Sequence, residues 1–379
     1  MRDGWTYKRL EEVATIKSGY TPSSDDLSDV GVVPYFKVGD MNMVGNEKYL
    51  QYSLSFVDDT FKTFPHNSIA FPKNGAAIAT NKKRILKQSS VVDLNTAVLI
   101  PIKNENVEYL YYWICKIDFR EITRRGAVPT LDIKTLMQLE VPYPPLSEQK
   151  RIVSELDLLS GIIEKKKEQL KTYDQLAQSI FYDMFASYED NTPTSNFILS
   201  LKGGKSLAGD EECKNKILKT GAVTYDFFKC DEVKNLPKDY IPLSENLLND
   251  GDLLVSRMNT LEYVGAVAYV WKAPNNTYLP DRLWRAKLND NVNPIFLWFS
   301  LKQPKAKEQI RSLSSGTSGS MKNISIPRFL SILIKNPPLS LQQSFAEKVE
   351  AIEKQKTLVQ QSIVETQTMF DFTMDKYFG

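Results

Sequence analysis

The chain has 379 residues, of which 42% are hydrophobic and 25% are charged. This composition excludes a disordered or collagen-like protein, and the length suits two domains of about 150 residues with connecting segments. The net charge of +2 is unevenly divided, with +1 in residues 1–146, −3 in 147–190, +6 in 191–338 and −2 in 339–379. The two longer segments are therefore the parts expected to face a polyanion.

The sequence also argues against a membrane protein and a disulfide-stabilised one. No apolar run approaches the roughly 18 residues that span a bilayer, and Met1–Leu10 carries charges in place of an apolar signal core. Cys115, Cys213 and Cys230 are odd in number, widely spaced and without a CxxC pair, which is untypical of disulfide frameworks and zinc sites. We expect a cytoplasmic protein with reduced structural thiols, no metal and no membrane partner.

Residues 1–143 form the first predicted domain, which we call the first head. Short β-branched and aromatic runs alternate with Gly, Pro, Asn and Asp, a pattern that predicts a mixed α/β domain with much irregular loop. The expected strands are 31–38, 68–71, 91–94 and 97–100, and a helix is expected at 107–117.

Residues 144–190 are predicted to form a long helix that starts after the Tyr143-Pro-Pro-Leu-Ser-Glu-Gln149 motif, with Ser147 as its N-cap. Its apolar residues follow an alternating spacing of four and three, broken by Lys166, which is typical of a coiled-coil seam. The predicted pairing residues are Ile152, Leu156, Leu159, Ile163 and Leu170.

Residues 191–336 form the second predicted domain, the second head, which has the same mixed α/β pattern. Strands are expected at 252–255 and 264–270 and a helix at 294–301. Residues 337–379 then repeat the long helix after Asn336-Pro-Pro-Leu-Ser-Leu-Gln342, with Ser340 and Gln343 as a capping box. Here the predicted pairing residues are Phe345, Val349, Ile352, Val359 and Ile363.

The two motifs belong to an internal repeat with an offset of 193 residues, which holds without gaps from Gly126/Gly319 to Phe185/Phe378. A duplicated head and helix implies pseudo-two-fold symmetry, so the two helices should pair antiparallel over roughly 60 Å. The predicted fold is α+β, with two mixed α/β heads joined by two long antiparallel coiled-coil helices. The alternative is that each helix is an ordinary amphipathic helix within its own domain.

Basic and amide side chains gather on the predicted loops of both heads rather than on one helix. Loops on a rigid core are the usual place for binding residues. Arg can pair with guanine and Asn with adenine, while Lys and Ser mostly hold phosphates. Taken singly, each residue fits a solvated surface equally well, so the clusters carry the prediction. The candidate DNA-binding residues are Lys73, Asn74, Asn81, Lys82, Lys83, Arg84, Arg124, Arg125, Gly126, Lys202, Lys205, Arg257, Asn259, Arg282, Ser315, Thr317 and Ser318.

Two divergent heads, each followed by PPLS-x-Q and a heptad helix, resemble the DNA specificity subunit of type I restriction-modification systems. The resemblance covers nearly the whole chain and includes Trp5–Gly19 and Pro34–Asp40, which look like the opening of a target-recognition domain. The second head departs from this pattern, because Asn196–Lys205 replaces the usual opening and Gly221–Tyr225 lacks an acidic residue matching Asp40. The two heads are therefore expected to contact DNA differently.

The resemblance implies that the chain is a non-catalytic specificity subunit. Each head would read one half of a bipartite double-stranded DNA target, and the helices would space the halves and dock two methyltransferase subunits, to which motor-nuclease restriction subunits attach. No cofactor is expected in this chain. S-adenosylmethionine, ATP and Mg²⁺ would bind the partner subunits.

The sequence gives weak support to the hypothesis that the chain is an enzyme. Asn336-Pro-Pro-Leu339 resembles the catalytic motif of adenine methyltransferases, but it has Leu339 in place of an aromatic residue and Tyr143 as its repeat partner, which favours a strand-to-helix junction. Gly204-Lys205-Ser206 lacks the glycine that a phosphate loop needs five residues earlier. His66 is the only histidine, which leaves almost no material for a catalytic triad. The remaining alternative is a coiled-coil adaptor that binds proteins without binding DNA.

Overall fold

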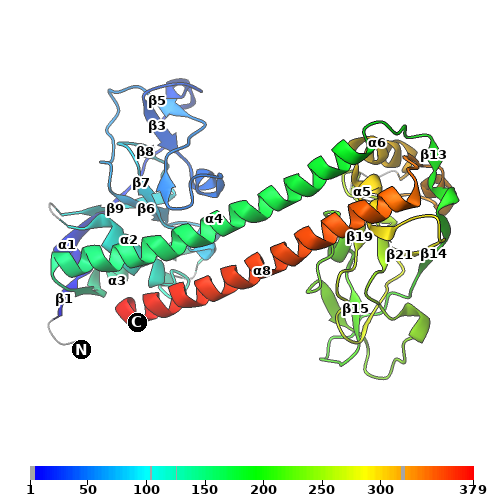
Figure 1. The fold of residues 1–379 in the computed structure, drawn as a ribbon. Helices are drawn as coiled ribbons and strands as arrows, with labels where there is room; N and C mark the ends of the chain where they lie inside the picture. The colour runs from blue at the N-terminus through cyan, green and yellow to red at the C-terminus, as the bar shows by residue number, and fades with distance from the viewer. Residues whose placement is uncertain (1–4, 103–104, 125, 317–320) are drawn as a thin grey trace. The chain divides into compact units, whose positions relative to one another are not determined.

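A computed structural model describes residues 5–102, 105–124, 126–316 and 321–379 (Figure 1). The chain divides into two compact units, one formed by Met1–Lys167 with Gln361–Gly379 and the other by Glu168–Gln360. Each unit contains one head and parts of both long helices. The predicted α+β class is confirmed in both units. None of the described helices is long and apolar enough to cross a membrane.

The first head contains a five-stranded sheet and a three-stranded sheet. The larger sheet has the order β2(Ala14–Ser18), β9(Thr96–Pro101), β6(Ile69–Pro72), β7(Arg84–Leu86), β4(Tyr49–Leu50), and the smaller sheet has the order β5(Phe56–Val57), β3(Val33–Phe36), β8(Val91–Val92). The pairs β4·β7 and β3·β8 are parallel, and the other pairs are antiparallel. The remaining elements are β1(Thr6–Arg9) paired with β12(Glu140–Tyr143), β10(Thr123–Arg124) paired with β11(Thr130–Leu131), α1(Leu10–Val13), α2(Val107–Lys116) and α3(Ile133–Gln138).

The second head contains a four-stranded sheet and a three-stranded sheet. The larger sheet has the order β14(Ile198–Gly203), β21(Leu283–Leu288), β17(Leu253–Ser256), β19(Val267–Tyr269), and the smaller sheet has the order β16(Val233–Asn235), β15(Lys216–Leu218), β20(Thr277–Tyr278). Only β15·β20 is parallel. The remaining elements are β13(Thr192–Pro193) paired with β23(Leu333–Ile334), β18(Met258–Asn259) paired with β22(Lys322–Asn323), α5(Pro294–Lys302), α6(Pro304–Leu313) and α7(Ile326–Leu330).

The two heads share one topology. The order β2-β9-β6-β7 of the first head corresponds to β14-β21-β17-β19 of the second, and β5-β3-β8 corresponds to β16-β15-β20, including its one parallel pair. The duplication therefore extends through the heads, where the ungapped sequence repeat is not visible. Their short strands and long loops have diverged in sequence, while the pattern of strand pairing has not.

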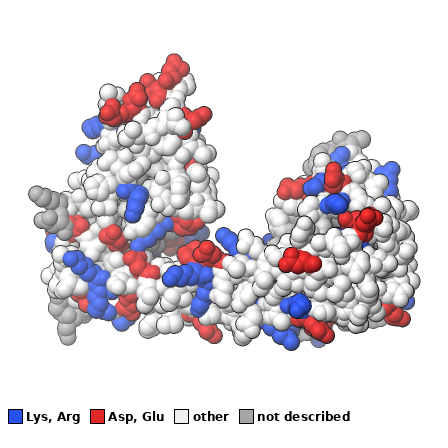
Figure 2. Space-filling model, turned by 45° about the horizontal axis from the view of Figure 1, so that its top comes forward, with Lys and Arg blue, Asp and Glu red and all other residues white. Residues whose placement is uncertain are grey.

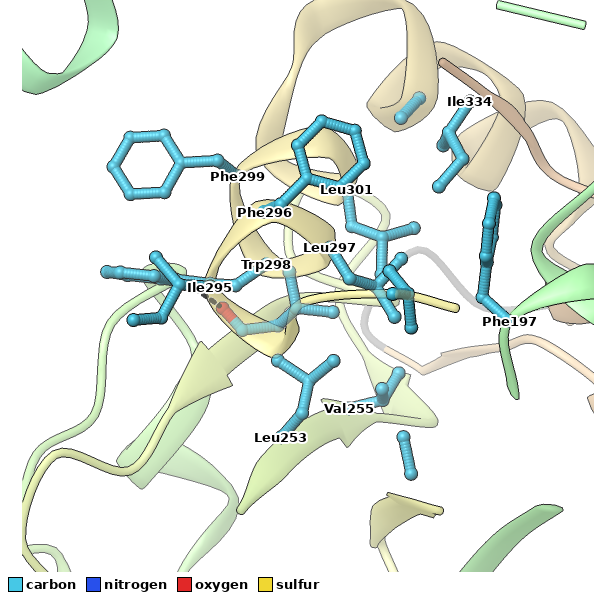
Figure 3. Close-up of a cluster of buried hydrophobic side chains, with 14 of the residues drawn as sticks. Phe197, Leu253, Val255, Ile295, Phe296, Leu297, Trp298, Phe299, Leu301 and Ile334 are labelled. Atoms are coloured by element: carbon cyan, nitrogen blue, oxygen red, sulfur yellow. Dashed lines mark hydrogen bonds between the residues drawn. The ribbon is translucent and has the colours of Figure 1, made fainter. Parts of the chain in front are cut away.

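In each head an apolar helix covers one face of the larger sheet. Helix α5 buries nearly all its side chains, and its N-cap Asn293 accepts hydrogen bonds from the first turn. Figure 3 shows Leu253 and Val255 rising from β17 toward Phe296 and Trp298 of α5. The helices predicted at 107–117 and 294–301 are therefore confirmed as α2 and α5, whereas α6 and α7 were not expected from the sequence.

The long helices α4(Leu146–Phe185) and α8(Leu339–Phe378) pair antiparallel within each unit, as predicted (Figure 1). In the first unit the guanidinium of Arg151 donates to the hydroxyl of Tyr377 at 2.8 Å, and the ammonium of Lys166 donates to the hydroxyl of Thr366 at 3.2 Å. Residues further along α4 therefore contact residues earlier in α8, as in an antiparallel pair. In the second unit the Phe181 and Phe345 rings lie 5.4 Å apart.

The heads themselves cover much of each helical seam. Ile152 and Leu156 share the first head's core, and Phe345, Val349 and Ile352 share the second head's core; all five are buried. The remaining predicted pairing residues are Leu159 and Ile163, which are buried, and Leu170, Val359 and Ile363, which are half-buried. Each long helix packs both on a head and on the other long helix. The structure therefore combines the predicted coiled-coil pair with the alternative of an amphipathic helix within its own domain.

The predicted caps of the long helices are wrong. Helical turns begin at Leu146 and Leu339, so the Ser147 and Ser340 hydroxyls already lie inside the first turn and cannot act as N-caps, and the Ser340–Gln343 capping box fails with them. A proline, Pro145 or Pro338, stands directly before the first helical residue, where its missing backbone N–H leaves no donor without a partner.

A buried glutamine secures each helix start instead. The amide of Gln149 donates to the carbonyl of Pro144 at 3.0 Å, and that of Gln342 donates to the carbonyl of Pro337 at 2.9 Å. The Gln342 side-chain oxygen also accepts from the N–H of Asn293, the N-cap of α5, at 2.9 Å. The glutamine of the PPLS-x-Q motif thus joins the long helix to the preceding loop, and in the second head also to the core helix.

Candidate nucleic-acid interface

Three neighbouring strands of the first head bring polar residues together at one edge of the sheet. Because β2 and β6 both run antiparallel to β9, their carboxyl ends lie beside the amino end of β9. The backbone N–H of Lys73, after β6, donates to the carbonyl of Asn95, before β9, at 2.8 Å. The ammonium of Lys73 donates to the hydroxyl of Ser18, at the end of β2, at 2.9 Å. We call Ser18, Lys73, Asn74 and Asn95 the first reading edge.

The second head builds the same edge from different residues. The N–H of Arg257 donates to the carbonyl of Arg282 at 3.1 Å, as that of Lys73 does to Asn95. The match extends further, because Leu131 N–H donates to the Lys73 carbonyl at 2.9 Å and Ile324 N–H to the Arg257 carbonyl at 3.0 Å. Positions 131 and 324 are separated by the 193-residue offset of the repeat. Lys73 is therefore equivalent to Arg257, and Asn95 to Arg282; Gly203, Arg257 and Arg282 form the second reading edge.

A shallow depression of about 300 Å³ lies against the first reading edge. Its floor includes Gly75, whose φ of +74° suits glycine and whose position has open space in front of it. Donors and acceptors surround this open backbone, a mixture suited to reading base edges. The lining residues are Lys37, Val38, Gly39, Asn74, Gly75, Ala76, Ala77, Asp93, Asn95 and Val128.

The Gly204-Lys205-Ser206 segment lies beside the second reading edge. A Cβ at Gly204 would stand 1.8 Å from the carbonyl oxygen of Leu279, so only glycine fits there. Ser206 hydrogen-bonds the carboxylate of Asp281, next to Arg282. The segment therefore packs as a loop against the strand end, with Lys205 exposed beside the edge. This close packing accounts for the glycine.

The other predicted DNA-binding residues are spread over each head, and Arg124, Lys202 and Asn259 lie in the strands β10, β14 and β18 rather than on loops. Arg124 is exposed but makes two hydrogen bonds of 2.9 Å to Asp132, the N-cap of α3. The hydrogen bonds from Arg124 lower the pKa of Asp132 to about 2. Lys202, Gly126 and Ser315 are exposed, Asn259 is half-buried and donates to Thr224 at 3.2 Å, and Arg125, Thr317 and Ser318 lie outside the described residues.

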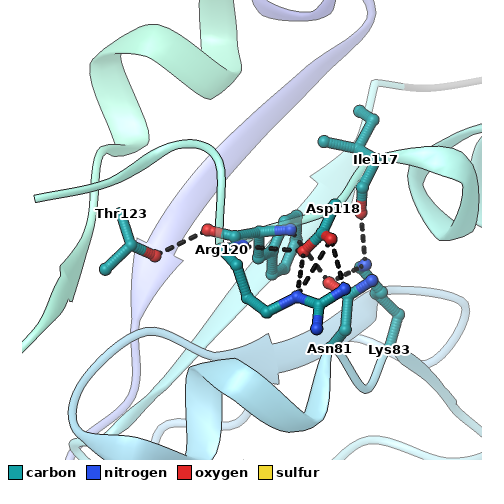
Figure 4. Close-up of polar contacts among 7 residues, drawn as sticks. Asn81, Lys83, Ile117, Asp118, Arg120 and Thr123 are labelled. Atoms are coloured by element: carbon teal, nitrogen blue, oxygen red, sulfur yellow. Dashed lines mark hydrogen bonds and ion pairs between the residues drawn. The ribbon is translucent and has the colours of Figure 1, made fainter. Parts of the chain in front are cut away.

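The prediction for Lys83 is wrong, and Asn81 and Arg84 also make interior contacts. Lys83 is 2% exposed, and its ammonium donates to the side chain of Asn81 and to the carbonyl of Ile117, both at 2.7 Å (Figure 4). Arg84 donates to the carbonyls of Lys83 and Met41 at 2.8 and 3.1 Å. A side chain buried and bonded in this way cannot reach a phosphate. Lys82 remains half-buried and bonded to Asn42.

The buried Lys83 should leave a signature in the pH dependence of stability. Burial lowers its pKa to about 8, below its ordinary value of 10.5. Between these values the unfolded chain binds more protons than the folded one, so the free energy of unfolding should rise with pH from about 8 to about 10.5. We expect Lys83→Met to remove up to roughly 3 kcal/mol of this rise. Denaturant unfolding of both proteins across that pH range measures it, and equal slopes would contradict the expectation.

Charges of both signs are mixed over one face of the molecule. On the face shown in Figure 2, Lys and Arg alternate with Asp and Glu, and no broad basic field appears. On this face, net charge alone gives a polyanion no broad region to bind. The sequence missed Ser18, Lys37 and Asn95 because single polar residues at strand ends carry no distinctive pattern.

The fold and these edges define a tandem-duplicated α+β protein with two equivalent loop-bearing edges suited to nucleic acid. The chain belongs to the type I restriction modification DNA specificity domain family, whose model matches residues 2–172 and 183–367. It is 26% identical over 235 residues to the type I restriction enzyme EcoKI specificity subunit of Escherichia coli, a match covering 56% of this chain and 50% of that protein. The chain thus spans about half the length of this relative.

Two further comparisons cover more of the molecule. The type I restriction enzyme MjaVIII specificity subunit of Methanocaldococcus jannaschii is 26% identical over 308 residues, which is 74% of this chain and 70% of that protein. The crystal structure of a type I restriction-modification S subunit from M. genitalium matches with a TM-score of 0.58 at 15% identity, over 99% of this chain and 96% of that one. That last likeness concerns the fold.

Proposed function

We propose that this chain is the DNA sequence-recognition subunit of a type I restriction-modification complex. Each head reads one half of a bipartite target, and helices α4 and α8 set the gap between the halves. Four segments carry these roles, 1–143 and 191–336 as target-recognition domains and 144–190 and 337–379 as spacers. Membership of the specificity-domain family supports this assignment.

The observation that carries the proposal is the pair of equivalent reading edges. Two heads with one strand topology place Lys73 and Asn95 in one copy where Arg257 and Arg282 stand in the other. A scaffold that is kept while its exposed edge residues change is what recognition of two different half-sites requires.

The outer faces of the long helices support docking of protein partners. Leu158, Leu358, Val364 and Phe372 are 57–70% exposed although they are apolar. Exposed apolar side chains on the long helices are candidate contacts for a protein partner. We infer that two methyltransferase subunits dock here, with motor-nuclease subunits joining the complex through them.

Catalysis and its cofactors belong to those partners in this proposal. S-adenosylmethionine, ATP and Mg²⁺ would be bound by the methyltransferase and restriction subunits, and the chain itself would act in the cytoplasm without performing chemistry. Asn336, the residue that resembles a methyltransferase motif, lies between β23 and the start of α8, at a strand-to-helix junction as the sequence predicted.

Selection from randomised duplex DNA tests this function. The chain is assembled with its cognate methyltransferase subunit and incubated with the library at several salt concentrations, and the retained DNA is sequenced. We expect enrichment of a motif in two separated parts with a fixed gap, and affinity that falls steeply with salt. A well-formed complex that enriches no motif would instead favour the protein-binding adaptor.

A further inference from the structure

Position 282 in the second head and position 95 in the first are equivalent places on the two reading edges. We propose that each contacts a base of its half-site, with Arg282 directing the second head to a guanine and Asn95 directing the first head to an adenine. This inference rests on the proposed function and assigns a base preference to one residue in each head.

The equivalence of the two positions follows from backbone hydrogen bonds. Asn95 comes directly before Thr96, the first residue of β9, and Arg282 comes directly before Leu283, the first residue of β21. The carbonyl of each accepts a hydrogen bond from the N–H of the residue that follows the neighbouring strand. These bonds of 2.8 and 3.1 Å fix the backbone of Asn95 and Arg282 at the edge. A side chain leaving a fixed backbone can present its donors and acceptors at a defined place.

Both side chains are exposed and available. Among the described residues, Asn95 and Arg282 have no side-chain hydrogen bond or ion pair. Two other arginines of the second head are engaged, since Arg285 pairs with Asp252 at 2.9 Å and Arg328 donates to a backbone carbonyl at 3.0 Å. Asp281, the acidic neighbour of Arg282, is occupied by the Ser206 hydroxyl. Among the described residues, no ion pair joins the guanidinium of Arg282 to Asp281 or to another carboxylate.

The surroundings of Arg282 favour a base over a simple solvated role. Arg257 lies alongside, its guanidinium 5.8 Å from the Trp284 ring centroid, and its buried Nε has no hydrogen-bond partner among the described residues. Two arginines on adjacent strand ends can hold one phosphate and one base, since Arg pairs bidentately with the O6 and N7 of guanine.

The first reading edge has the complementary chemistry for adenine. Asn95 and Asn74 both line the depression beside the edge, and an amide side chain can pair with the N6 and N7 of adenine. Lys73, the equivalent of Arg257, supplies the positive charge for a phosphate there. The two heads thus share a phosphate-holding position and differ at the base-reading one.

Reciprocal substitution tests the inference. Arg282→Asn and Asn95→Arg are made separately in the full chain, assembled with its cognate methyltransferase subunit and tested by selection from randomised duplex DNA. For Arg282→Asn we expect the preference for guanine over adenine at one position of one half-site to fall by at least about tenfold. For Asn95→Arg we expect a change of base at one position of the half-site read by the first head, with the half-site read by the second head unchanged.

Lys287→Asn is the matched control, because it removes one exposed positive charge from the other end of β21 and should leave both half-motifs as they are. A uniform loss of affinity without a change of motif in Arg282→Asn would identify a phosphate contact and overturn the inference, as would unaltered motifs in both variants. If the native complex itself selects no motif, the proposed function fails instead, so the two failures are distinguishable.

Discussion

Replacing Phe345 by alanine is expected to lower the free energy of unfolding of the second unit by about 3–5 kcal/mol. The Phe345 side chain is fully buried, and its ring lies 5.4 Å from Phe181, 5.4 Å from Phe185 and 5.1 Å from Phe299. Alanine would leave a cavity where α4, α8 and the core helix α5 meet, and three large rings cannot close it.

Hydrogen exchange measures this effect in the right part of the chain. Because the protein contains two compact units, a single unfolding midpoint does not report on one of them. We expect amides of β17 and α5 to exchange faster in Phe345→Ala, and those of β6 and β9 to change little. The control is Phe372→Ala on the same helix, where the ring is 70% exposed and the expected change is within about 0.5 kcal/mol. Equal effects of the two substitutions would refute the packing described for the second unit.

Removing both arginines of the second reading edge should reduce DNA affinity by about 100-fold or more. Arg257 and Arg282 stand on adjacent strand ends, and each contact with a base or phosphate is worth on the order of 1–3 kcal/mol. Loss of the phosphate contact made by Arg257 should also flatten the dependence of log K on log salt by about 1. Titration of Arg257→Ala/Arg282→Ala against target duplex at several salt concentrations measures both effects.

The double variant Lys272→Ala/Lys287→Ala removes the same charge from elsewhere on the second head. Lys287 belongs to the far end of β21, and Lys272 follows β19 at the end that pairs with the start of β17, so both lie away from the reading edge. We expect this variant to bind within a few-fold of the native complex. If it loses as much affinity as the arginine variant, binding depends on net charge and the reading edge has no special role.

The long helices could be predicted from the sequence because their determinants are local. A heptad spacing that begins after two prolines requires no knowledge of the rest of the chain, and both helices were placed within two residues of their true starts. The cap was assigned to Ser147 because its residue type is the usual one. The role of Gln149 could not be seen, since it depends on how the chain folds back onto the Pro144 carbonyl.

The reading edges could not be predicted from the sequence because their determinants are not local. The sheet brings Ser18, Lys73 and Asn95 together because β2, β9 and β6 are neighbouring strands. The order of such short, divergent strands cannot be predicted from their sequences. The same limit explains Lys83, which belongs to a basic run that looks like a binding loop. The backbone turns at Asn81, where φ is +53°, and directs the Lys83 ammonium inward to the Ile117 carbonyl.

The claim that the two heads read separate halves of one DNA target is tested most directly by mapping methylated bases. The chain would be expressed with its cognate methyltransferase subunit, and genomic DNA would be sequenced by a single-molecule method that detects base modification. We predict a motif in two parts with a constant gap, and exchange of residues 191–336 for those of a relative should change one part only. A continuous motif, or a change in both parts after exchanging one head, would contradict the account.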